Sequence, residues 1–430
     1  MKINDITIMV HRFGPLENIS FKLAPMMIFT GMSSLGKSYA NYLVYYFMSS
    51  VCNGKFLEPF KEQKDDETVV RQYVFDLDVF FKSLADNAES FMRKFLGDEE
   101  LKCDIEFKSP KRNRTISVEL KKVKVNAPEK EENDLLHSQQ PYEIGFDEKQ
   151  RRIVPSINYA RFYAERRIQE FILGEVIAYE VILPPGRGAF VGENFSVKSV
   201  VASSMDMYNL YFRDYDNGIS ARIRFRNVDN NHLPERILRL TSGGDLYSVE
   251  GKQYLQLEDG GRLALSAGAS SIKDLSPWLF YLKNQWMVPC SFCMEEPEAH
   301  QHPSVTVQIA DVMSMAMHQK APNMFHLTTH SDYLIQRLNQ LVKLGSIRRK
   351  DKNLFKKICE ERGLDEQSYL DAADIKAYYF RKDDRGKTVV EPLDVTDDGI
   401  PMKSFFDVVN DLNEREEYIN DAIYRMEKGA

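Results

Sequence analysis

The chain has 430 residues, of which 43% are hydrophobic and 28% are charged, and this composition predicts a globular protein with a sizeable core. Its net charge of −7 excludes a basic field over the whole protein, so any contact with DNA or RNA needs a local patch. An odd number of cysteines, an N-terminus without an apolar leader and no apolar stretch of bilayer length predict a reduced, cytoplasmic protein with no membrane partner.

The N-terminal part of the chain predicts strands that lead into a phosphate-binding loop. Segments 6–10 and 19–23 carry Ile, Val, Phe or Leu at every second position, which is typical of half-buried strands. The apolar run 26–30 predicts a buried strand, and 37–48 predicts a helix rich in Ala, Leu, Tyr, Phe and Met. Between them, 31–38 reads Gly-Met-Ser-Ser-Leu-Gly-Lys-Ser, a complete G-x-x-x-x-G-K-[ST] pattern.

The strand, the glycine loop and the helix together give this pattern a physical meaning. Its glycines allow backbone N–H groups to close around phosphate oxygens, and the helix N-terminus adds partial positive charge. Lys37 would reach the β- and γ-phosphates, and the Ser38 hydroxyl would bind Mg²⁺. The predicted nucleotide contacts in this region are Gly31, Ser33, Ser34, Gly36, Lys37, Ser38 and Tyr39. An ordinary glycine turn before a helix is the alternative interpretation.

Segment 51–180 predicts a mixture of helices and strands. The expected elements are a helix at 66–96, a hairpin of the alternating runs 103–107 and 116–120 with a basic tip at 109–113, a polar mobile loop near 126–142 and a helix around 156–175. Strands and helices then alternate. The expected elements are strands at 181–183, 237–240, 254–257, 287–294, 324–327, 375–380 and 388–392, and a closing helix at 402–427.

The strand predicted at 287–294 leads into Glu-Glu-Pro-Glu-Ala-His at 295–300. A buried strand that ends in two adjacent acids is what phosphoryl transfer on a phosphate loop requires. Glu295 would bind the metal, and Glu296 would orient and deprotonate the attacking water. A charged strand end that faces solvent is the alternative.

Two pairs of residues near this strand invite a metal-binding interpretation. Cys290 and Cys293 lie within an apolar run with no second pair of ligands nearby, so buried thiols are favoured over zinc binding. His300 and His302 lie two residues apart with no further ligand identified, so a zinc site there is disfavoured as well.

Further segments agree with one family in their order along the chain. Segment 265–268 (Leu-Ser-Ala-Gly), followed by a helix, resembles the signature of ABC-type ATPases, and 329–332 (Thr-His-Ser-Asp) resembles their switch histidine. Segment 184–187 is similar to a Pro-x-x-Arg element, and 11–13 lies where adenine contacts occur. With the acidic segment, they resemble ABC-type ATPase heads of the group that includes overcoming-lysogenization-defect (OLD), RecF-like and SMC-like proteins.

The resemblance implies a fold and a division into domains. The fold would be α/β, a P-loop NTPase of the ABC-ATPase head type with a mixed sheet and helices, plus an α+β insertion. Residues 1–50 and 180–400 would form the head, 51–180 the insertion and 401–430 a C-terminal helix.

The resemblance also implies ATP and Mg²⁺ as ligands, bound between two chains of a dimer or a ring of dimers. Ser266 and Gly268 would contact the γ-phosphate held by the opposite chain, and Phe13 would contact adenine. The catalytic residues would be Lys37, Glu296 and His330, and the metal ligands Ser38 and Glu295. A plain helix N-cap for Ser266 and an ordinary histidine for His330 are the alternatives.

Some features depart from the family pattern. Ala267 replaces a glycine of the signature, the metal-binding acid is Glu rather than Asp, and no acidic cluster of a TOPRIM nuclease follows His330. The resemblance therefore implies a separate effector chain, such as a TOPRIM nuclease, as in two-gene anti-phage systems of the PARIS type, where a phage protein is the trigger.

Two other functions stay open, an ATP-gated interaction scaffold with little turnover and a RecF-like DNA-repair ATPase. The second depends on local basic clusters, because the chain as a whole is acidic. The three clusters are Lys108 with Lys111, Arg112 and Arg114; Arg161 with Arg166 and Arg167; and Arg348 with Arg349, Lys350, Lys352, Lys356 and Lys357.

Overall fold

The computed structural model describes residues 3–52, 71–122, 142–146, 150–191, 206–211, 236, 240, 244–249, 252–257, 259–285 and 289–427. The mobile loop predicted near 126–142 and most of the strand predicted at 237–240 lie outside these residues. The other predicted elements can be compared with the structure directly.

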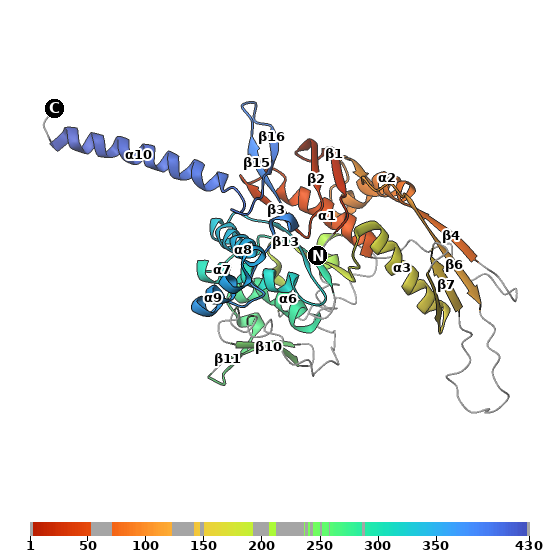
Figure 1. The fold of residues 1–430 in the computed structure, drawn as a ribbon. Coiled ribbons are helices and arrows are strands. Elements are labelled where there is room, and N and C mark those ends of the chain that lie inside the picture. The colour runs from red at the N-terminus through yellow and green to blue at the C-terminus, as the bar shows by residue number, and fades with distance from the viewer. Residues whose placement is uncertain are drawn as a thin grey trace.

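A six-stranded sheet forms the centre of the molecule (Figure 1). Its order is β16-β15-β3-β14-β13-β9; the strands from β15 to β9 run parallel, and β16 runs antiparallel to β15. The strands are β3 (Met26–Gly31), β9 (Tyr179–Leu183), β13 (Cys290–Glu295), β14 (Met324–Thr328), β15 (Ile375–Lys382) and β16 (Thr388–Leu393). The predicted mixed α/β sheet is therefore present, and the carboxyl ends of β3, β14 and β13 share one edge.

Helices cover both faces of this sheet, which explains why every residue of β3, β13 and β14 is buried. On one face lies α1 (Lys37–Cys52), where the thiol of Cys293 donates to a backbone carbonyl of the helix. On the other lies α6 (Ser270–Gln285), whose Trp278 ring meets Phe325 of β14 edge-on at 6.2 Å between centroids. The long apolar runs of the sequence are thus strands that are buried on both faces of the sheet.

Several predicted elements are confirmed with small shifts in their bounds. They are β1 (Thr7–Phe13), β2 (Leu16–Lys22), α3 (Ile157–Leu173), β11 (Lys252–Leu257) and α10 (Lys403–Glu427). The structure also contains η2 (Arg187–Phe190), β10 (Gly244–Val249), β12 (Arg262–Ala264), η4 (Leu265–Ala267), α7 (Pro303–Met317), α8 (Asp332–Lys350) and α9 (Lys352–Arg362).

The predicted hairpin of 103–107 and 116–120 is wrong. Both runs form strands, but β5 (Cys103–Lys108) pairs with β1, which gives the antiparallel sheet β2-β1-β5. The second run, β6 (Thr115–Lys122), belongs to a separate sheet of order β4-β6-β7-β8, whose other strands are β4 (Arg71–Asp76), β7 (Tyr142–Phe146) and β8 (Gln150–Val154). Alternation of apolar residues identifies a half-buried strand but does not identify its partner. Two strands that follow each other in the sequence can therefore belong to different sheets.

The helix predicted at 66–96 begins later than expected. Residues 71–76 form β4 (Arg71–Asp76), and α2 (Leu77–Leu96) starts after Asp76. The Asp76 carboxylate accepts hydrogen bonds from the backbone N–H groups of Asp78 and Val79, which is the usual N-cap arrangement. This acid is the sequence signal that marks the helix start.

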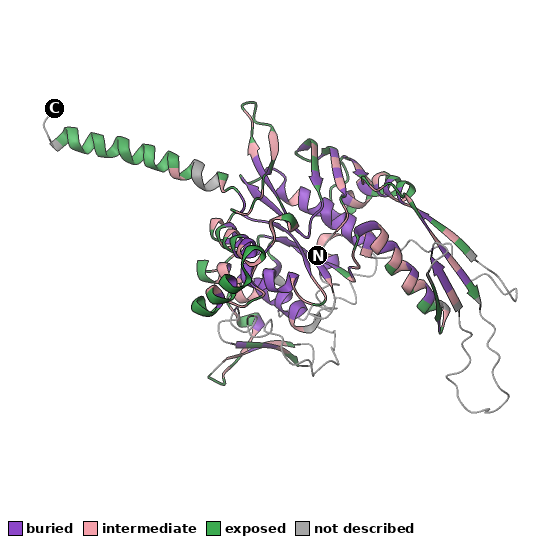
Figure 2. Ribbon diagram, in the orientation of Figure 1, coloured by how far each residue is buried: buried purple, intermediate pink, exposed green. Residues whose placement is uncertain are grey.

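The remaining elements lie around the central sheet. The sheet of β4, β6, β7 (Tyr142–Phe146) and β8 (Gln150–Val154) lies on one side of the body, and α10 extends from the opposite side (Figure 1). Nearly all described residues of α10 are exposed, whereas those of β3, β13 and β14 are buried (Figure 2). Within the parts of the chain that the structure describes, no helix is both long and apolar enough to cross a membrane.

The packing of α8 gives a testable prediction about stability. A Cβ atom at Gly345 would lie 1.9 Å from the backbone oxygen of Leu370, in the segment that leads to β15. Gly345→Ala should therefore destabilise the protein by about 1–3 kcal/mol, although alanine favours a helix over glycine by roughly 1 kcal/mol. Chemical unfolding measures the difference in free energy.

The matched control is Gly363→Ala at the end of α9, where a Cβ meets no atom within 4 Å but φ is +60°. Backbone strain alone should cost about 1–2 kcal/mol there. A stabilised Gly345→Ala variant would contradict the close packing of α8.

Candidate functional site

The phosphate loop has a backbone that requires glycine at two positions. Gly31 has φ +116° and Gly36 has φ +93°, and Ser34 between them has φ +61°. A Cβ at Gly31 would lie 2.2 Å from the oxygen of Phe380 in β15, because β3 and β15 pair up to this residue. The loop therefore leaves β3 along a path that few other residues could take, and α1 begins directly after it.

Lys37 is the first residue of α1 and is 5% exposed. Its ammonium donates hydrogen bonds to the carbonyl oxygens of Gly31, at 3.2 Å, and Met32, at 2.6 Å, so the side chain lies over the loop. Burial lowers the pKa of Lys37 to about 8, although Glu296 and Glu295 act in the opposite direction. The two acids thus lie close enough to Lys37 to act on the pKa of its ammonium.

Glu295 ends β13 and is 3% exposed. Its carboxylate accepts hydrogen bonds from the Ser38 hydroxyl at 2.6 Å, the Thr328 hydroxyl at 2.9 Å and the Asn41 amide at 3.0 Å. Burial raises the pKa of Glu295, and these three hydrogen bonds oppose the rise. The predicted pair Ser38 and Glu295 is therefore in direct contact. Hydroxyl and carboxylate oxygens are ligands that Mg²⁺ prefers, so the pair fits this ion.

Glu296 and His330 face each other at the same edge of the sheet. Glu296 follows β13 with φ +44°, and its backbone N–H donates to the carbonyl oxygen of Thr328 at 3.1 Å. One Glu296 carboxylate oxygen lies 3.8 Å from Nε2 of His330. Burial lowers the pKa of His330, Lys37 lowers it further, and Glu296 raises it. A positive φ at a residue other than glycine is a strained state that is typical of functional sites.

Three residues that sequence reasoning missed hold these groups in place. Asn41 and Thr328 are hydrogen-bonded to Glu295, and Asn41 also donates to the carbonyl oxygen of Met294. A polar Asn within an otherwise apolar helix was the available signal. Glu298 accepts hydrogen bonds from the Thr329 hydroxyl, at 2.6 Å, and from the backbone N–H of His330, at 2.9 Å. Its signal was a third acid in the same short segment.

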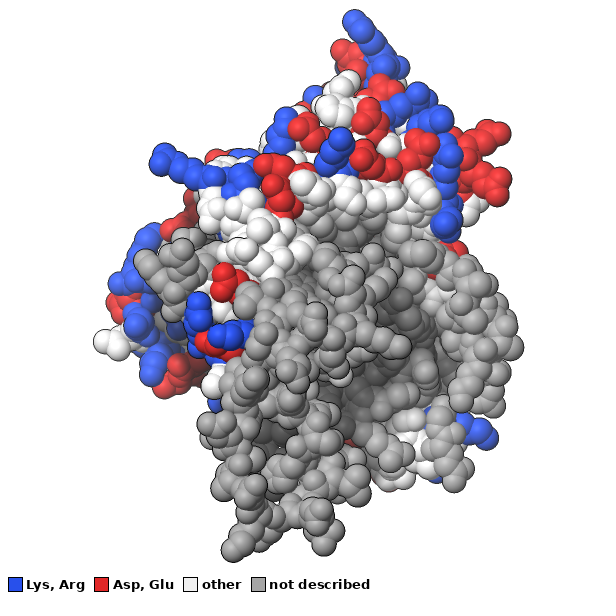
Figure 3. Space-filling view, turned by 90° about the vertical axis from the view of Figure 1, so that its right-hand side faces the viewer, with Lys and Arg blue, Asp and Glu red and all other residues white. Residues whose placement is uncertain are grey.

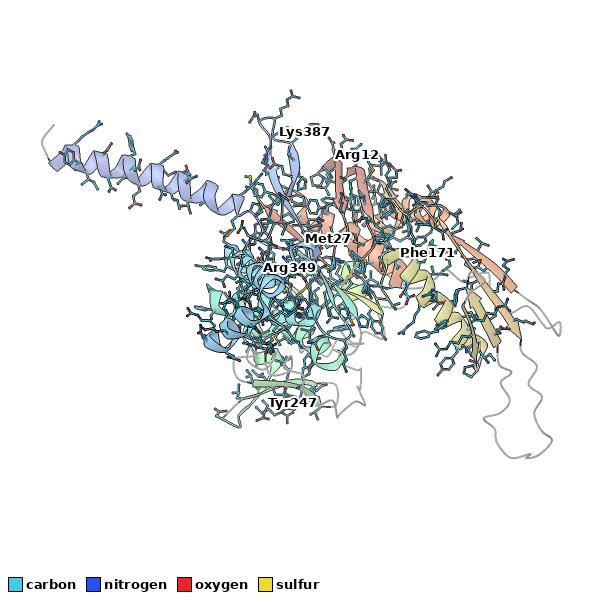
Figure 4. The ribbon with its side chains drawn as sticks, viewed as in Figure 1. Arg12, Met27, Phe171, Tyr247, Arg349 and Lys387 are labelled. Atoms are coloured by element: carbon cyan, nitrogen blue, oxygen red, sulfur yellow. The ribbon has the colours of Figure 1, made fainter. Side chains whose placement is uncertain are left out.

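The aromatic residues expected beside the nucleotide are arranged differently from the prediction. Phe13 is fully buried, and its ring centroid lies 4.9 Å from that of Tyr39, which is half-buried. Phe13 therefore offers no exposed surface for adenine and instead supports Tyr39. Figure 4 labels Arg12, an exposed neighbour of Phe13 at the rim formed by β1 and β2, and Met27, which is buried within β3.

The signature-like segment lies between β12 and α6. Leu265 is buried, Ser266 is exposed, and the backbone N–H of Gly268 donates to the carbonyl oxygen of Leu265 at 3.0 Å. Among the described residues, no hydrogen bond or ion pair joins Ser266 or Gly268 to the phosphate loop of the same chain. The structure thus brings Lys37, the acids and His330 together, but not this segment.

The two cysteines and the two histidines considered for metal binding each have protein contacts that do not require a metal. Cys290 and Cys293 are buried in β13, where burial raises the pKa of both thiols. His302 caps α7 by accepting a hydrogen bond from the N–H of Ser304, and Nδ1 of His300 lies 2.6 Å from the Asp274 carboxylate.

Many cations of the basic clusters already have partners within the chain. Figure 3 shows positive and negative side chains interspersed over the described part of one face. The Lys111 ammonium lies 3.5 Å from the centroid of the Phe171 ring, a residue labelled in Figure 4. Ion pairs within or beside the clusters are Lys108 with Glu106, Arg114 with Asp78, Arg167 with Glu170, Arg349 with Asp371 and Asp397, and Lys350 with Asp397. These contacts weaken the prediction of a phosphate-binding surface.

Comparisons with known proteins give only distant likenesses. No family model matches the sequence, and no curated protein matches it. Two solved structures are similar in shape: the SMC head bound to the C-terminal winged-helix domain of ScpA, and the SMC head domain from Thermotoga maritima. The first is 11% identical, covers 92% of this chain and 98% of that chain, and has a TM-score of 0.38. The second is 10% identical, covers 92% and 100%, and has a TM-score of 0.33. At these scores neither carries an argument about the site.

The lowered pKa of Lys37 predicts pH-dependent binding of a nucleoside triphosphate. The pKa is about 8 in the free protein, and a bound polyanion raises it because a nearby opposite charge favours the ammonium. Below this pH the ammonium is already formed, so pH has little effect through Lys37. Above it, binding takes up a proton, and the affinity falls as the pH rises, by up to about tenfold per unit.

Calorimetric titrations near pH 9 in buffers of different ionisation enthalpy measure this proton uptake. Lys37→Arg is the matched control, because a guanidinium stays charged in this range. We expect uptake of about one proton per site in the wild type and close to none in the variant. Equal uptake in both would assign the titration to another group.

Proposed function

We propose that this protein is an ATP hydrolase of the ABC type, with the site formed by the phosphate loop, the two acids after β13 and His330. The observation that carries the proposal is the contact between Ser38 and Glu295, which joins the start of α1 to the end of β13. Lys37, Glu296 and His330 surround this contact within mutual electrostatic reach. A loop for triphosphate, two oxygen ligands for Mg²⁺ and an acid for water are the parts that phosphoryl transfer needs.

Each residue of the site then has a separate role in the reaction. Backbone N–H groups of the loop and the Lys37 ammonium bind the β- and γ-phosphates. Ser38 and Glu295 hold Mg²⁺, which when bound neutralises charge on these phosphates. Glu296 orients a water molecule and accepts its proton as the water oxygen attacks the γ-phosphorus and ADP leaves. His330 donates a hydrogen bond to a γ-phosphate oxygen as charge develops there.

We further propose that each ATP site is completed by a second copy of the chain, in a dimer or a ring of dimers. Ser266 and Gly268 precede α6, so the Ser266 hydroxyl and the N–H groups at the start of α6 would form an anion site at a helix N-terminus, whereas the Gly268 N–H already donates to the carbonyl oxygen of Leu265. Ser266 is exposed, and among the described residues no hydrogen bond or ion pair joins this segment to the phosphate loop of its own chain. The exposure of Ser266 and the lack, in the described part of the chain, of hydrogen bonds between its segment and the loop of the same chain support a contact with a nucleotide held by the other copy.

The finer assignment is to the OLD-like group and to a cytoplasmic anti-phage system. It is supported by the Glu-Glu-Pro-Glu-Ala-His segment at 295–300. The ATPase would then regulate a separate effector, such as a TOPRIM nuclease, in response to a phage-encoded trigger. Co-purification with the product of a neighbouring nuclease gene tests this assignment. The RecF-like alternative requires salt-sensitive DNA binding by the isolated protein.

The role of Glu296 predicts a separation of turnover from binding. Glu296→Gln keeps the size of the side chain but removes the proton acceptor, so kcat should fall by about 10²–10⁴-fold, with ATP affinity and ATP-dependent assembly retained. Phosphate release, equilibrium binding and light scattering measure these three quantities. Glu417→Gln on the exposed helix α10 is the control and should behave as the wild type.

An unchanged kcat in Glu296→Gln would remove this residue from the mechanism. If the wild type binds ATP and assembles but shows negligible turnover, the interaction scaffold would replace the hydrolase as the function.

The position of Asn41 predicts a selective effect on the metal requirement. Asn41→Ala removes a hydrogen bond that fixes the Glu295 carboxylate, so the Mg²⁺ concentration for half-maximal turnover should rise by about 10-fold or more. The control is Gln169→Ala, which removes a buried amide that donates to the carbonyl oxygen of Val51 at the far end of α1. Equal Mg²⁺ requirements in both variants would contradict a metal-binding role for Glu295.

A further inference from the structure

A buried guanidinium contacts the backbone of the two acids that follow β13. The Arg187 side chain in η2 is 1% exposed, and its hydrogen bonds go to backbone carbonyl oxygens. Nη1 donates to Glu295 at 2.7 Å and to Pro184 at 3.3 Å, Nη2 donates to Glu296 at 3.4 Å, and Nε donates to Asp274 at 2.7 Å. One planar group therefore joins the end of β9, the end of β13 and the second turn of α6.

The contacts with β13 bear directly on the shape of the acidic segment. Glu296 has φ +44°, and a strained backbone of this kind persists only where its surroundings fix it. Arg187 binds the carbonyl oxygens of Glu295 and Glu296, which belong to the two peptide groups that flank the Glu296 Cα. Loss of the guanidinium would leave these oxygens without their charged donor and would let the backbone relax.

The contacts with α6 are reinforced by a second set of hydrogen bonds. The Asp274 carboxylate accepts a hydrogen bond from the backbone N–H of Gly188 at 2.8 Å, and its other oxygen lies 2.6 Å from Nδ1 of His300. The Gln301 amide donates to the carbonyl oxygen of Ser271 at 2.9 Å. The first turns of α6 are therefore fastened to the Arg187 segment and to the chain that follows the acids.

We propose that Arg187 is a positioning residue that couples α6 to the orientation of Glu296. Because α6 follows the 265–268 segment directly, contact of that segment with nucleotide would move or hold α6. The position of α6 would then affect the Glu296 backbone, because the Arg187 guanidinium is hydrogen-bonded both to the Asp274 carbonyl of α6 and to the Glu296 carbonyl. The inference rests on the proposed function, since it assigns a consequence to nucleotide contact at Ser266 and Gly268.

The test compares turnover with binding in variants of the full chain. Arg187→Met fills the space without a charge, and Arg187→Lys keeps one donor group. We expect kcat to fall on the order of 10²-fold in Arg187→Met, because a displaced reacting group has this effect. Affinity for a fluorescent ATP analogue should change by less than about threefold, since the loop and Lys37 bind it. Arg187→Lys should restore part of the lost kcat.

Two further variants separate coupling from folding. Gly188→Ala leaves Arg187 intact, but its Cβ would lie 2.3 Å from an Asp274 carboxylate oxygen, so it displaces α6 and should also lower kcat. Arg337→Met removes another largely buried arginine, which pairs with Asp311 on α7 at 2.7 Å. It should lower the midpoint of thermal unfolding and leave kcat and affinity unchanged.

A double-mutant cycle with Ser266→Ala measures the coupling itself. If Arg187 transmits contact at Ser266 to Glu296, then Ser266→Ala should lower kcat in the wild type but have little further effect in Arg187→Met or Gly188→Ala. Additive effects would overturn the inference, and so would a parallel loss of affinity and kcat in both Arg187 variants. A wild type that does not hydrolyse ATP would instead overturn the proposed function, which is a separate outcome.

Discussion

The hydrogen bond between Ser38 and Glu295 is the contact on which the rest of the site depends. It joins the helix after the phosphate loop to a strand that is not adjacent to the loop strand, because β14 lies between β3 and β13. A buried carboxylate needs partners, and here two hydroxyls and an amide from α1 and β14 supply them. These hydrogen bonds hold α1, β13 and β14 together at the edge of the sheet where the proposed site lies.

The parallel sheet explains how residues distant in sequence reach this contact. Parallel neighbours place their carboxyl ends at one edge, so Gly31, Glu295 and the segment after Thr328 emerge together. The same edge concentrates backbone conformations that few residues adopt, at Gly31, Ser34 and Glu296. Arg187 binds the carbonyl oxygens of Glu295 and Glu296, and Glu298 binds the backbone N–H of His330, so charged side chains hold the backbone on both sides of the site while Glu295 stays buried and Glu296 remains exposed.

Local chemistry could be predicted from the sequence better than long-range pairing. The loop, the strand before it and the acids after β13 follow from motifs whose physical roles depend on neighbouring residues. The partner of β5 could not be predicted, because the alternating run of that strand fits β1 and β6 equally well. The burial of Phe13 behind Tyr39 and the bonds of Arg187 depend on tertiary packing, and neither leaves a periodic signal.

The position of Lys37 has a consequence for which anions the loop can accept. Its ammonium already donates to two carbonyl oxygens, those of Gly31 and Met32, so an incoming anion must compete with them for two of its three hydrogens. A small monovalent anion replaces only part of that interaction, whereas a polyphosphate supplies several oxygens to the lysine and to the loop N–H groups at once. On the proposed function, the loop would therefore favour polyphosphates over ligands that carry a single phosphate.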